Sequence, residues 1–196
     1  MVLLTFLRNG GIKMIKKMEL TDGFIILRPY RLSDGKRLYE AARESILEVS
    51  VWLTWYHPGY SIEESRTWVE ARDAAWHKGT NYDFTMVDPR DGSYLGGCGI
   101  NDIRGEHEFA NLGYWVRTSR TRQGLATAAT LLLGRFGFEE LKLNRIEIVV
   151  NTGNKASQRV ATKAGATREG ILRNRLILRG KPVDAVMFSL IPRDLP

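Results

Sequence analysis

The spacing of apolar and polar residues along the chain predicts short strands that alternate with helices. Apolar residues between Leu38 and Ile46 recur at steps of three and four, which places them on one face of a helix that Ser33-Asp34 would cap. Ser61 and Glu64 have the spacing of a capping box for a second helix. The pattern predicts helices over residues 33–47, 61–77, 123–141 and 155–163, and strands over residues 24–27, 81–87, 94–101, 109–116, 146–150, 168–171 and 183–190.

The first seventeen residues do not share this pattern. Their apolar stretch, Val2–Leu7, is too short for a signal peptide, and Gly10-Gly11 interrupts any helix there. We expect residues 1–17 to form a flexible or loosely docked extension, with an interface-forming arm as the alternative. Residues 18–196 contain no repeat, low-complexity tract or linker, so we expect one mixed α/β domain there.

Composition and charge limit the class of protein. Hydrophobic residues make up 43% of the chain, enough for a core, and the single cysteine, Cys98, excludes an internal disulfide framework. No apolar run approaches the roughly 20 residues that a membrane helix needs, so we expect no membrane contact. The lone cysteine and the missing signal peptide favour the cytoplasm.

The net charge of +7 would by itself favour a nucleic acid or another polyanion as partner. However, residues 18–116 hold 10 basic and 16 acidic side chains, whereas residues 117–196 hold 15 basic and 6 acidic ones. An acidic middle and a basic C-terminal part predict an anionic ligand on one part and a cationic ligand on the other. Two differently solvated faces are the alternative.

A loop before the third predicted helix has the composition of a phosphate-binding site. The first N–H groups of a helix lack internal partners and lie at the positive end of its dipole, so they bind phosphate oxygens. Gly124 lets a ligand approach the backbone, and Thr127 adds a hydroxyl donor. Three basic side chains are expected to surround this loop: Arg117, Arg120 and Arg122. The pattern matches neither the Walker motif nor the dinucleotide fingerprint.

Several segments of the chain form a specific combination. They are Asn111-Leu112-Gly113-Tyr114-Trp115, Gln123-Gly124-Leu125-Ala126-Thr127, Asn154-x-x-Ser157, Ala164-Gly165-Ala166-x-x-Glu169-Gly170-Ile171-Leu172-Arg173, Trp52-Leu53-x-Trp55-x-x-Pro58 and Arg28-Pro29. This combination resembles the GNAT acetyltransferases, and more narrowly the RimJ/RimL group of ribosomal-protein N-terminal acetyltransferases, over roughly residues 24–191. It implies the α/β (α+β) GNAT fold: a single mixed, mostly antiparallel sheet with splayed fourth and fifth strands and helices on both faces.

The resemblance also implies a site and a reaction. Acetyl-CoA, the co-substrate, would lie between the splayed strands and pair with Trp115 and Val116. Its pyrophosphate would bind the amides of Arg122, Gln123, Gly124, Leu125, Ala126 and Thr127. Asn154 would anchor the cofactor arm, and Ser157 would protonate the departing thiolate while the amine attacks the acetyl carbonyl directly. No metal is implied, and the three histidines show no metal-ligand spacing.

The acceptor side is predicted less precisely. Trp55, Tyr56 and His57 precede a Pro-Gly turn and are expected to line the acceptor pocket, with core packing as the alternative. An acidic residue that is proposed as the base in the group falls near Leu176, which cannot act as one. Four other residues are candidates by type only, with a water relay as the alternative: Glu48, His57, Asp83 and Asp102. Cys98 lies in an apolar run and is expected to be a small buried side chain.

We therefore expect an acetyl-CoA-dependent N-acetyltransferase whose acceptor is a protein N-terminus, such as that of a ribosomal protein. A GNAT enzyme that acetylates a small-molecule amine (an antibiotic, polyamine or amino acid) is the first alternative, because the acidic middle suits any cationic acceptor. A basic RNA- or ribosome-binding module is the second, but the C-terminal arginines lack interleaved aromatic residues, so direct nucleic-acid binding is not required. A homodimer is favoured slightly over a monomer.

Overall fold

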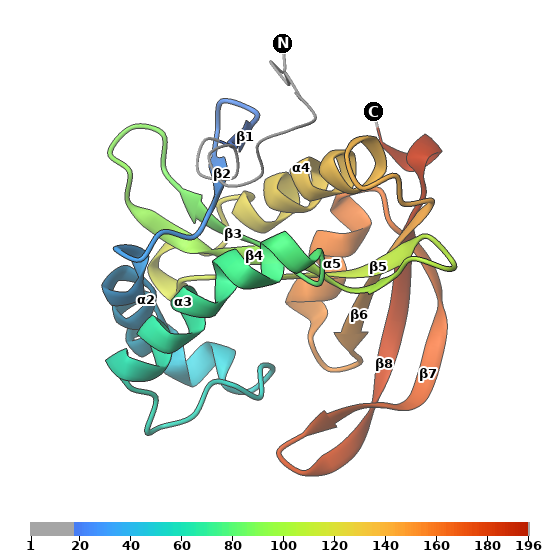
Figure 1. The fold of residues 1–196 in the computed structure, drawn as a ribbon. Coiled ribbons are helices and arrows are strands. Elements are labelled where there is room, and N and C mark those ends of the chain that lie inside the picture. The colour runs from blue at the N-terminus through green and yellow to red at the C-terminus, as the bar shows by residue number, and fades with distance from the viewer. Residues whose placement is uncertain (1–17, 196) are drawn as a thin grey trace.

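A computed structural model describes residues 18–195 of the chain, so the extension expected at residues 1–17 lies outside the described part. Eight strands form one sheet in the order β1-β2-β3-β4-β5-β6-β8-β7 (Figure 1). The strands are β1 (Leu20–Thr21), β2 (Ile26–Pro29), β3 (Tyr82–Val87), β4 (Tyr94–Arg104), β5 (Phe109–Val116), β6 (Arg145–Asn151), β7 (Thr167–Leu178) and β8 (Lys181–Leu190). The helices are α2 (Asp34–Val49), α3 (Ile62–Lys78), α4 (Leu125–Glu139) and α5 (Lys155–Lys163), with 3-10 turns η1 (Thr118–Arg120) and η2 (Pro192–Asp194).

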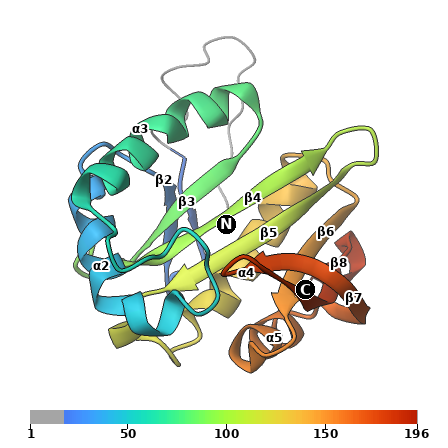
Figure 2. The same ribbon diagram turned by 90° about the horizontal axis from the view of Figure 1, so that it is seen from below.

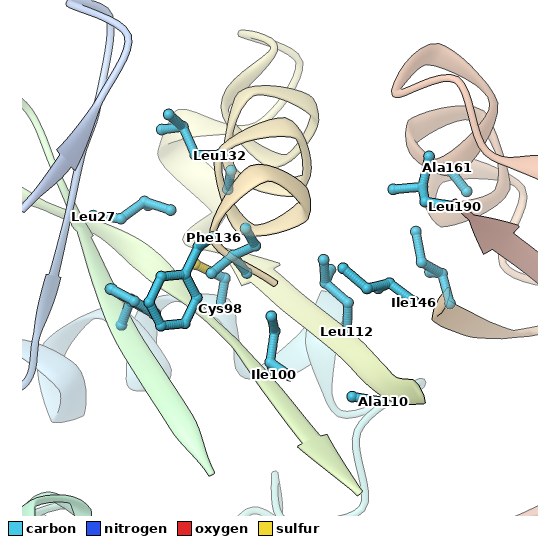
Figure 3. Packing of buried hydrophobic residues seen from close by; sticks show 14 of the residues in the cluster. Leu27, Cys98, Ile100, Ala110, Leu112, Leu132, Phe136, Ile146, Ala161 and Leu190 are labelled. Carbon is cyan, nitrogen blue, oxygen red and sulfur yellow. The ribbon is translucent and has the colours of Figure 1, made fainter. Parts of the chain in front are cut away.

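The helices cover both faces of the sheet, α2 and α3 on one and α4 and α5 on the other (Figures 1 and 2). The main core lies between the sheet and α4, where Leu132 and Phe136 contact a cluster that includes Ile100, Leu112 and Ile146 (Figure 3). Among residues 18–195, only β5 and β6 pair in parallel, and every other strand pair is antiparallel. The predicted mixed, mostly antiparallel sheet with helices on both faces is therefore confirmed.

Strands β5 and β6 separate soon after they begin. They pair only at Phe109 with Arg145, Ala110 with Ile146 and Asn111 with Glu147. Beyond this point β5 stays paired with β4 and β6 with β8, so the two strands diverge. These strands correspond to the fourth and fifth strands that the sequence predicts. Their labels are one higher in the structure because the short β1 was not predicted. The expected splay is confirmed.

The capping box of α3 is present, whereas the predicted Ser33 cap is wrong. The Glu64 amide donates to Ser61 Oγ at 3.2 Å, and the Ser61 amide donates to Glu64 Oε2 at 2.8 Å. Ser33 has helical backbone angles and makes no side-chain cap hydrogen bond. Its neighbour Asp34 accepts two hydrogen bonds from Arg28, at 2.7 and 2.8 Å, and this buried pair joins β2 to the start of α2.

Several predicted boundaries differ from the structure. The first predicted strand, 24–27, is shifted to Ile26–Pro29, because Asp22 Oδ1 accepts the amides of Phe24 and Ile25 and closes a turn. Helix α4 begins at Leu125 and not at Gln123, since Gly124 has a left-handed φ of 84°. Strand β4 continues to Arg104, and β7 covers twelve residues where four were predicted, so β7 and β8 form a long hairpin.

Candidate active site

A cleft of about 1230 Å³ lies where β5 and β6 separate. Its walls come from the loop between α2 and α3, from β4 to β6, from the loop before α4 and from the start of α5. Most of the predicted site residues line it: Trp55, His57, Trp115, Val116, Arg122, Gly124, Leu125, Ala126, Thr127, Asn154 and Ser157. Gln123 and Tyr56 are absent from its lining. The fold thus brings together residues as distant in the sequence as Trp55 and Ser157.

The loop before α4 presents free backbone donors to the cleft. Gly124 has a left-handed φ of 84°, and a Cβ added to it would meet no atom within 4 Å, so its backbone faces open space. The first hydrogen bond of the helix runs from the Ala128 amide to the Gly124 carbonyl at 3.0 Å. The amides of Leu125, Ala126 and Thr127 therefore precede the first internal partner and suit phosphate oxygens.

The three arginines near this loop differ in what they contact. Arg117 pairs with Glu44, through Nε at 3.1 Å and through a second nitrogen, and Arg120 pairs with Asp88 at 2.6 Å. Arg122 makes no ion pair within residues 18–195. The expectation that all three supply free positive charge is therefore corrected, because two of them are neutralised and hold the loop in place. Of these three arginines, Arg122 remains available to bind an anion.

Glu44 on α2 anchors η1 and predicts an acid-sensitive stability. It accepts hydrogen bonds from Arg117 and from the Ser119 amide, and these contacts lower its pKa from 4.5 to about 2. Because the folded pKa is depressed, the stabilisation is complete above the unfolded pKa and is lost as the pH falls toward 2. We expect Glu44→Gln to lower the melting temperature at neutral pH but not near pH 2, in thermal unfolding followed across this range.

The matched control for this prediction is Glu40→Gln on the same helix. Glu40 is exposed and lies 3.8 Å from Lys36, so its loss changes stability little. A melting-temperature difference between wild type and Glu44→Gln that stays constant from neutral pH to pH 2 would contradict the role of the carboxylate.

Ser157 lies in the first turn of α5 and faces Tyr114 of β5 across the cleft. Asn154 caps the helix, since its Oδ1 accepts the Ser157 amide at 3.0 Å. The Tyr114 hydroxyl lies 3.0 Å from Ser157 Oγ and donates to the Ser157 carbonyl at 3.1 Å. Burial raises the pKa of Tyr114 to about 12, so this phenol keeps its proton. Tyr114 was not predicted as a site residue, although it lies in the segment Asn111–Trp115 that carries the family resemblance.

The predicted acceptor residues separate into two environments. Trp55 lies with its ring centroid 6.0 Å from that of Trp115, and His57 Nε2 is 2.9 Å from Glu64 Oε1. Tyr56, by contrast, is only 4% exposed and stacks on Tyr60, so its expected place in the pocket lining is corrected to the core.

The four candidate bases also differ in position. Glu48, His57 and Asp83 line the cleft and Asp102 does not, whereas Leu176 does line it. Asp83 pairs with Arg72 at 2.7 Å, although burial outweighs this pair and raises the Asp83 pKa. Glu48 accepts the Thr118 hydroxyl at 3.2 Å.

Cys98 also lines the cleft, but burial raises the pKa of its thiol well above the usual value. It therefore remains protonated and packs as a small apolar side chain. In the described part of the chain, no group of three or more His, Cys, Asp and Glu side chains is placed to hold a metal ion. No helix among residues 18–195 combines the length and apolar character that crossing a membrane requires.

Comparison with known proteins gives the family. The model of the acetyltransferase (GNAT) domain matches residues 25–167. The chain is 35% identical over 104 residues to a Bacillus subtilis protein named "Putative ribosomal N-acetyltransferase YdaF", a match that covers 53% of this chain and 57% of that protein.

Solved structures agree with this match. A structure from Vibrio cholerae, described as "a putative ribosomal-protein-serine acetyltransferase", is 30% identical with a TM-score of 0.80, covering 90% of this chain and 99% of the other. Mycobacterium smegmatis RimJ in complex with CoA-disulfide is 25% identical with a TM-score of 0.79, covering 91% and 88%. The chain belongs to the GNAT acetyltransferases and is an acyltransferase with acetyl-CoA as its co-substrate.

Proposed function

We propose that this enzyme acetylates the N-terminal amine of a polypeptide of the ribosomal-protein type. The observation that carries the proposal is one continuous cleft, which joins the Gly124 loop to the Ser157–Tyr114 pair and also contains Glu48 and Glu64. The free amides suit the phosphates of acetyl-CoA, and the carboxylates suit an amine that arrives as a cation. The relatives named for ribosomal proteins support a polypeptide as acceptor.

Strand β5 would bind the cofactor arm, and Ser157 would donate the proton to the leaving group. The edge of β5 beyond Asn111 is free of β6 and would pair with the pantetheine arm through Trp115 and Val116. The cationic amine first loses one proton to water in the cleft. The neutral amine then attacks the acetyl carbon, so that a C–N bond forms and the C–S bond breaks. The Ser157 hydroxyl gives its proton to the thiolate, and the second proton released from the amine nitrogen replaces it.

The neighbours of Ser157 make it the better donor of this pair. The Tyr114 proton is engaged by the Ser157 carbonyl, so the tyrosine oxygen serves as an acceptor for the serine hydroxyl. Asn154 fixes the serine backbone at the start of α5. Tyr114 therefore orients the serine, and Ser157 would touch the leaving sulfur.

Replacement of Ser157 tests this division. We expect Ser157→Ala to lower kcat by about ten- to hundred-fold with little change in the Kd for acetyl-CoA, because proton transfer of this kind contributes about that much or more. Tyr114→Phe should lower kcat less. Thr162→Ala removes a hydroxyl from the same helix, where it bonds only the Gln158 carbonyl, and should leave kcat unchanged. If Ser157→Ala keeps the wild-type kcat, Ser157 has a structural role and is not the proton donor.

A small-molecule amine is the alternative acceptor. The aromatic side chains of Trp55, Tyr60 and Trp68 line the same cleft as the carboxylates, and such a set also binds small cations. Free-thiol release measured with peptides, polyamines and aminoglycosides in parallel separates the two acceptor classes. The non-enzymatic RNA-binding alternative is wrong, because the chain is an acetyltransferase.

We also propose a cellular location, an oligomeric state and a domain organisation for the enzyme. The ribosomal-protein relatives support the cytoplasm as its location. A homodimer and a single folded domain over residues 18–196 complete the proposal, and sedimentation velocity together with limited proteolysis tests both.

A further inference from the structure

The hairpin of β7 and β8 carries an excess of positive charge at its free end. It extends away from the rest of the sheet (Figure 1). Residues 170–183 contain four basic and no acidic side chains. All four are exposed, and none forms an ion pair within the described residues: Arg173, Arg175, Arg179 and Lys181. Glu169 at the base of the hairpin is already paired with Arg145 at 2.6 Å, so it does not neutralise them.

The exposed side chains of β7 are both cationic and apolar. Ile171 and Ile177 are 53% and 60% exposed, and the exposed Arg173 and Arg175 lie between them in the sequence. Leu172, Leu176 and Leu178 are half-buried. Strand β7 is also an edge of the sheet, so its outer backbone groups lack a partner strand among residues 18–195.

The pairing of β7 with β8 is irregular at a point close to the cleft. Leu172 pairs with Ala185 and Leu176 with Val183, so three residues of β7 oppose the single Asp184. Asp184 stabilises this bulge, because its Oδ1 accepts the Asn174 amide at 2.9 Å. Its carbonyl accepts the Thr152 amide at 3.2 Å, which anchors the bulge beside the loop that leads to α5. Leu176, just beyond the bulge, lines the cleft, so the free half of the hairpin is next to the acceptor entrance.

We infer that the exposed basic side chains at the free end of this hairpin bind acidic side chains of the acceptor polypeptide, a few residues after its acetylated amine; this inference rests on the function proposed above. An extended chain advances about 3.3 Å per residue, so residues shortly after the amine reach the hairpin as they leave the cleft beside Leu176. Arginine forks pair with carboxylates, and Ile171 and Ile177 offer apolar contact beside them. RNA fits less well, because residues 168–184 contain no aromatic side chain on which bases would stack.

Peptides of defined charge test the inference with the full-length enzyme. Three ten-residue peptides share their first two residues and carry four Glu, four Gln or four Lys at the next positions. We expect kcat/KM, followed by free-thiol release at low ionic strength, to be about ten-fold higher for the Glu peptide than for the Gln peptide and lowest for the Lys peptide. The difference should shrink as salt is added.

Charge reversal then assigns the effect to the hairpin. Arg173→Glu/Arg175→Glu should invert the order of the Glu and Lys peptides and leave the Kd for acetyl-CoA unchanged. Lys142→Glu/Arg193→Glu changes the net charge equally, but these residues adjoin the start of β6 and the end of β8, away from the hairpin tip and the cleft. This control should keep the wild-type order.

Three results would overturn the inference. Equal kcat/KM for all three peptides, or an unchanged order in the charge-reversed variant, rejects the hairpin while the proposed function stands. Acetylation of no peptide by a protein that binds acetyl-CoA rejects the proposed function and the inference with it. Fluorescence anisotropy showing that single-stranded RNA binds wild type but not the reversed variant, without any peptide preference, assigns these basic side chains to nucleic acid instead.

Discussion

Replacing Gly124 with glutamate is expected to weaken acetyl-CoA binding by at least about a hundred-fold, or roughly 2.7 kcal/mol. The substitution places a carboxylate beside the free amides at the start of α4, where the phosphates would bind. The new charge repels the phosphates and also satisfies the positive end of the helix itself. A side chain at φ 84° adds backbone strain of about 1–2 kcal/mol, which affects folding more than binding.

Gly23→Glu is the matched control for this prediction. Gly23 has a φ of 85°, and a Cβ there also meets no atom within 4 Å, so the strain is the same and the location is the turn between β1 and β2. Both variants should lose similar stability in urea unfolding. Only Gly124→Glu should lose the heat of acetyl-CoA binding in calorimetry. An unchanged Kd in Gly124→Glu would mean that the phosphates bind elsewhere.

The second large effect is expected at Asp34. Its side chain is 1% exposed and pairs with Arg28, which is 8% exposed, and it also accepts the Arg31 amide at 2.8 Å. Asp34→Ala leaves the guanidinium buried without a counter-charge, which costs about 3–5 kcal/mol of unfolding free energy. Because Asp34 begins α2, whose later residue Glu44 holds η1, the loss also loosens the anchor of the loop before α4.

Two further variants distinguish the effect of burial from the effect of an unpaired charge. Glu19→Ala removes an exposed pair with Arg31 at 3.7 Å and should cost less than about 1 kcal/mol. Arg28→Met/Asp34→Leu removes both charges and should cost less than Asp34→Ala alone. Urea unfolding of the three proteins measures these differences. Equal costs for Asp34→Ala and Glu19→Ala would contradict the role of burial.

The parts of the fold with a strong local signal were predictable. Ile146, Ile148 and Val150 alternate with partly exposed residues in β6, and burial of every second residue makes such a strand recognisable. Strand β7 has no such signal, because it is an edge strand whose residues are all exposed or half-buried. The bulge at Asn174, where φ is 52°, also interrupts the two-residue period, so only the start of β7 was predicted.

The same division applies to the candidate site. The Gly124 loop was predictable because a glycine before an apolar helix is a local pattern. The contact of Tyr114 with Ser157 joins residues 43 positions apart, and that of Arg117 with Glu44 joins residues 73 apart, so neither leaves a trace in local spacing. Tyr56 shows the remaining difficulty, since an aromatic residue near a Pro-Gly turn serves equally well in a pocket or in the core.

The most direct test of the proposed function is to identify which amine receives the acetyl group. A peptide with a free N-terminus and one internal lysine is incubated with acetyl-CoA and the enzyme, beside the same peptide with a blocked N-terminus. Fragmentation mass spectrometry then locates the added group. We expect one acetyl group on the α-amine of the free peptide and none on the blocked one. Acetylation of the lysine alone, or of neither peptide while a small amine is acetylated, would contradict the account.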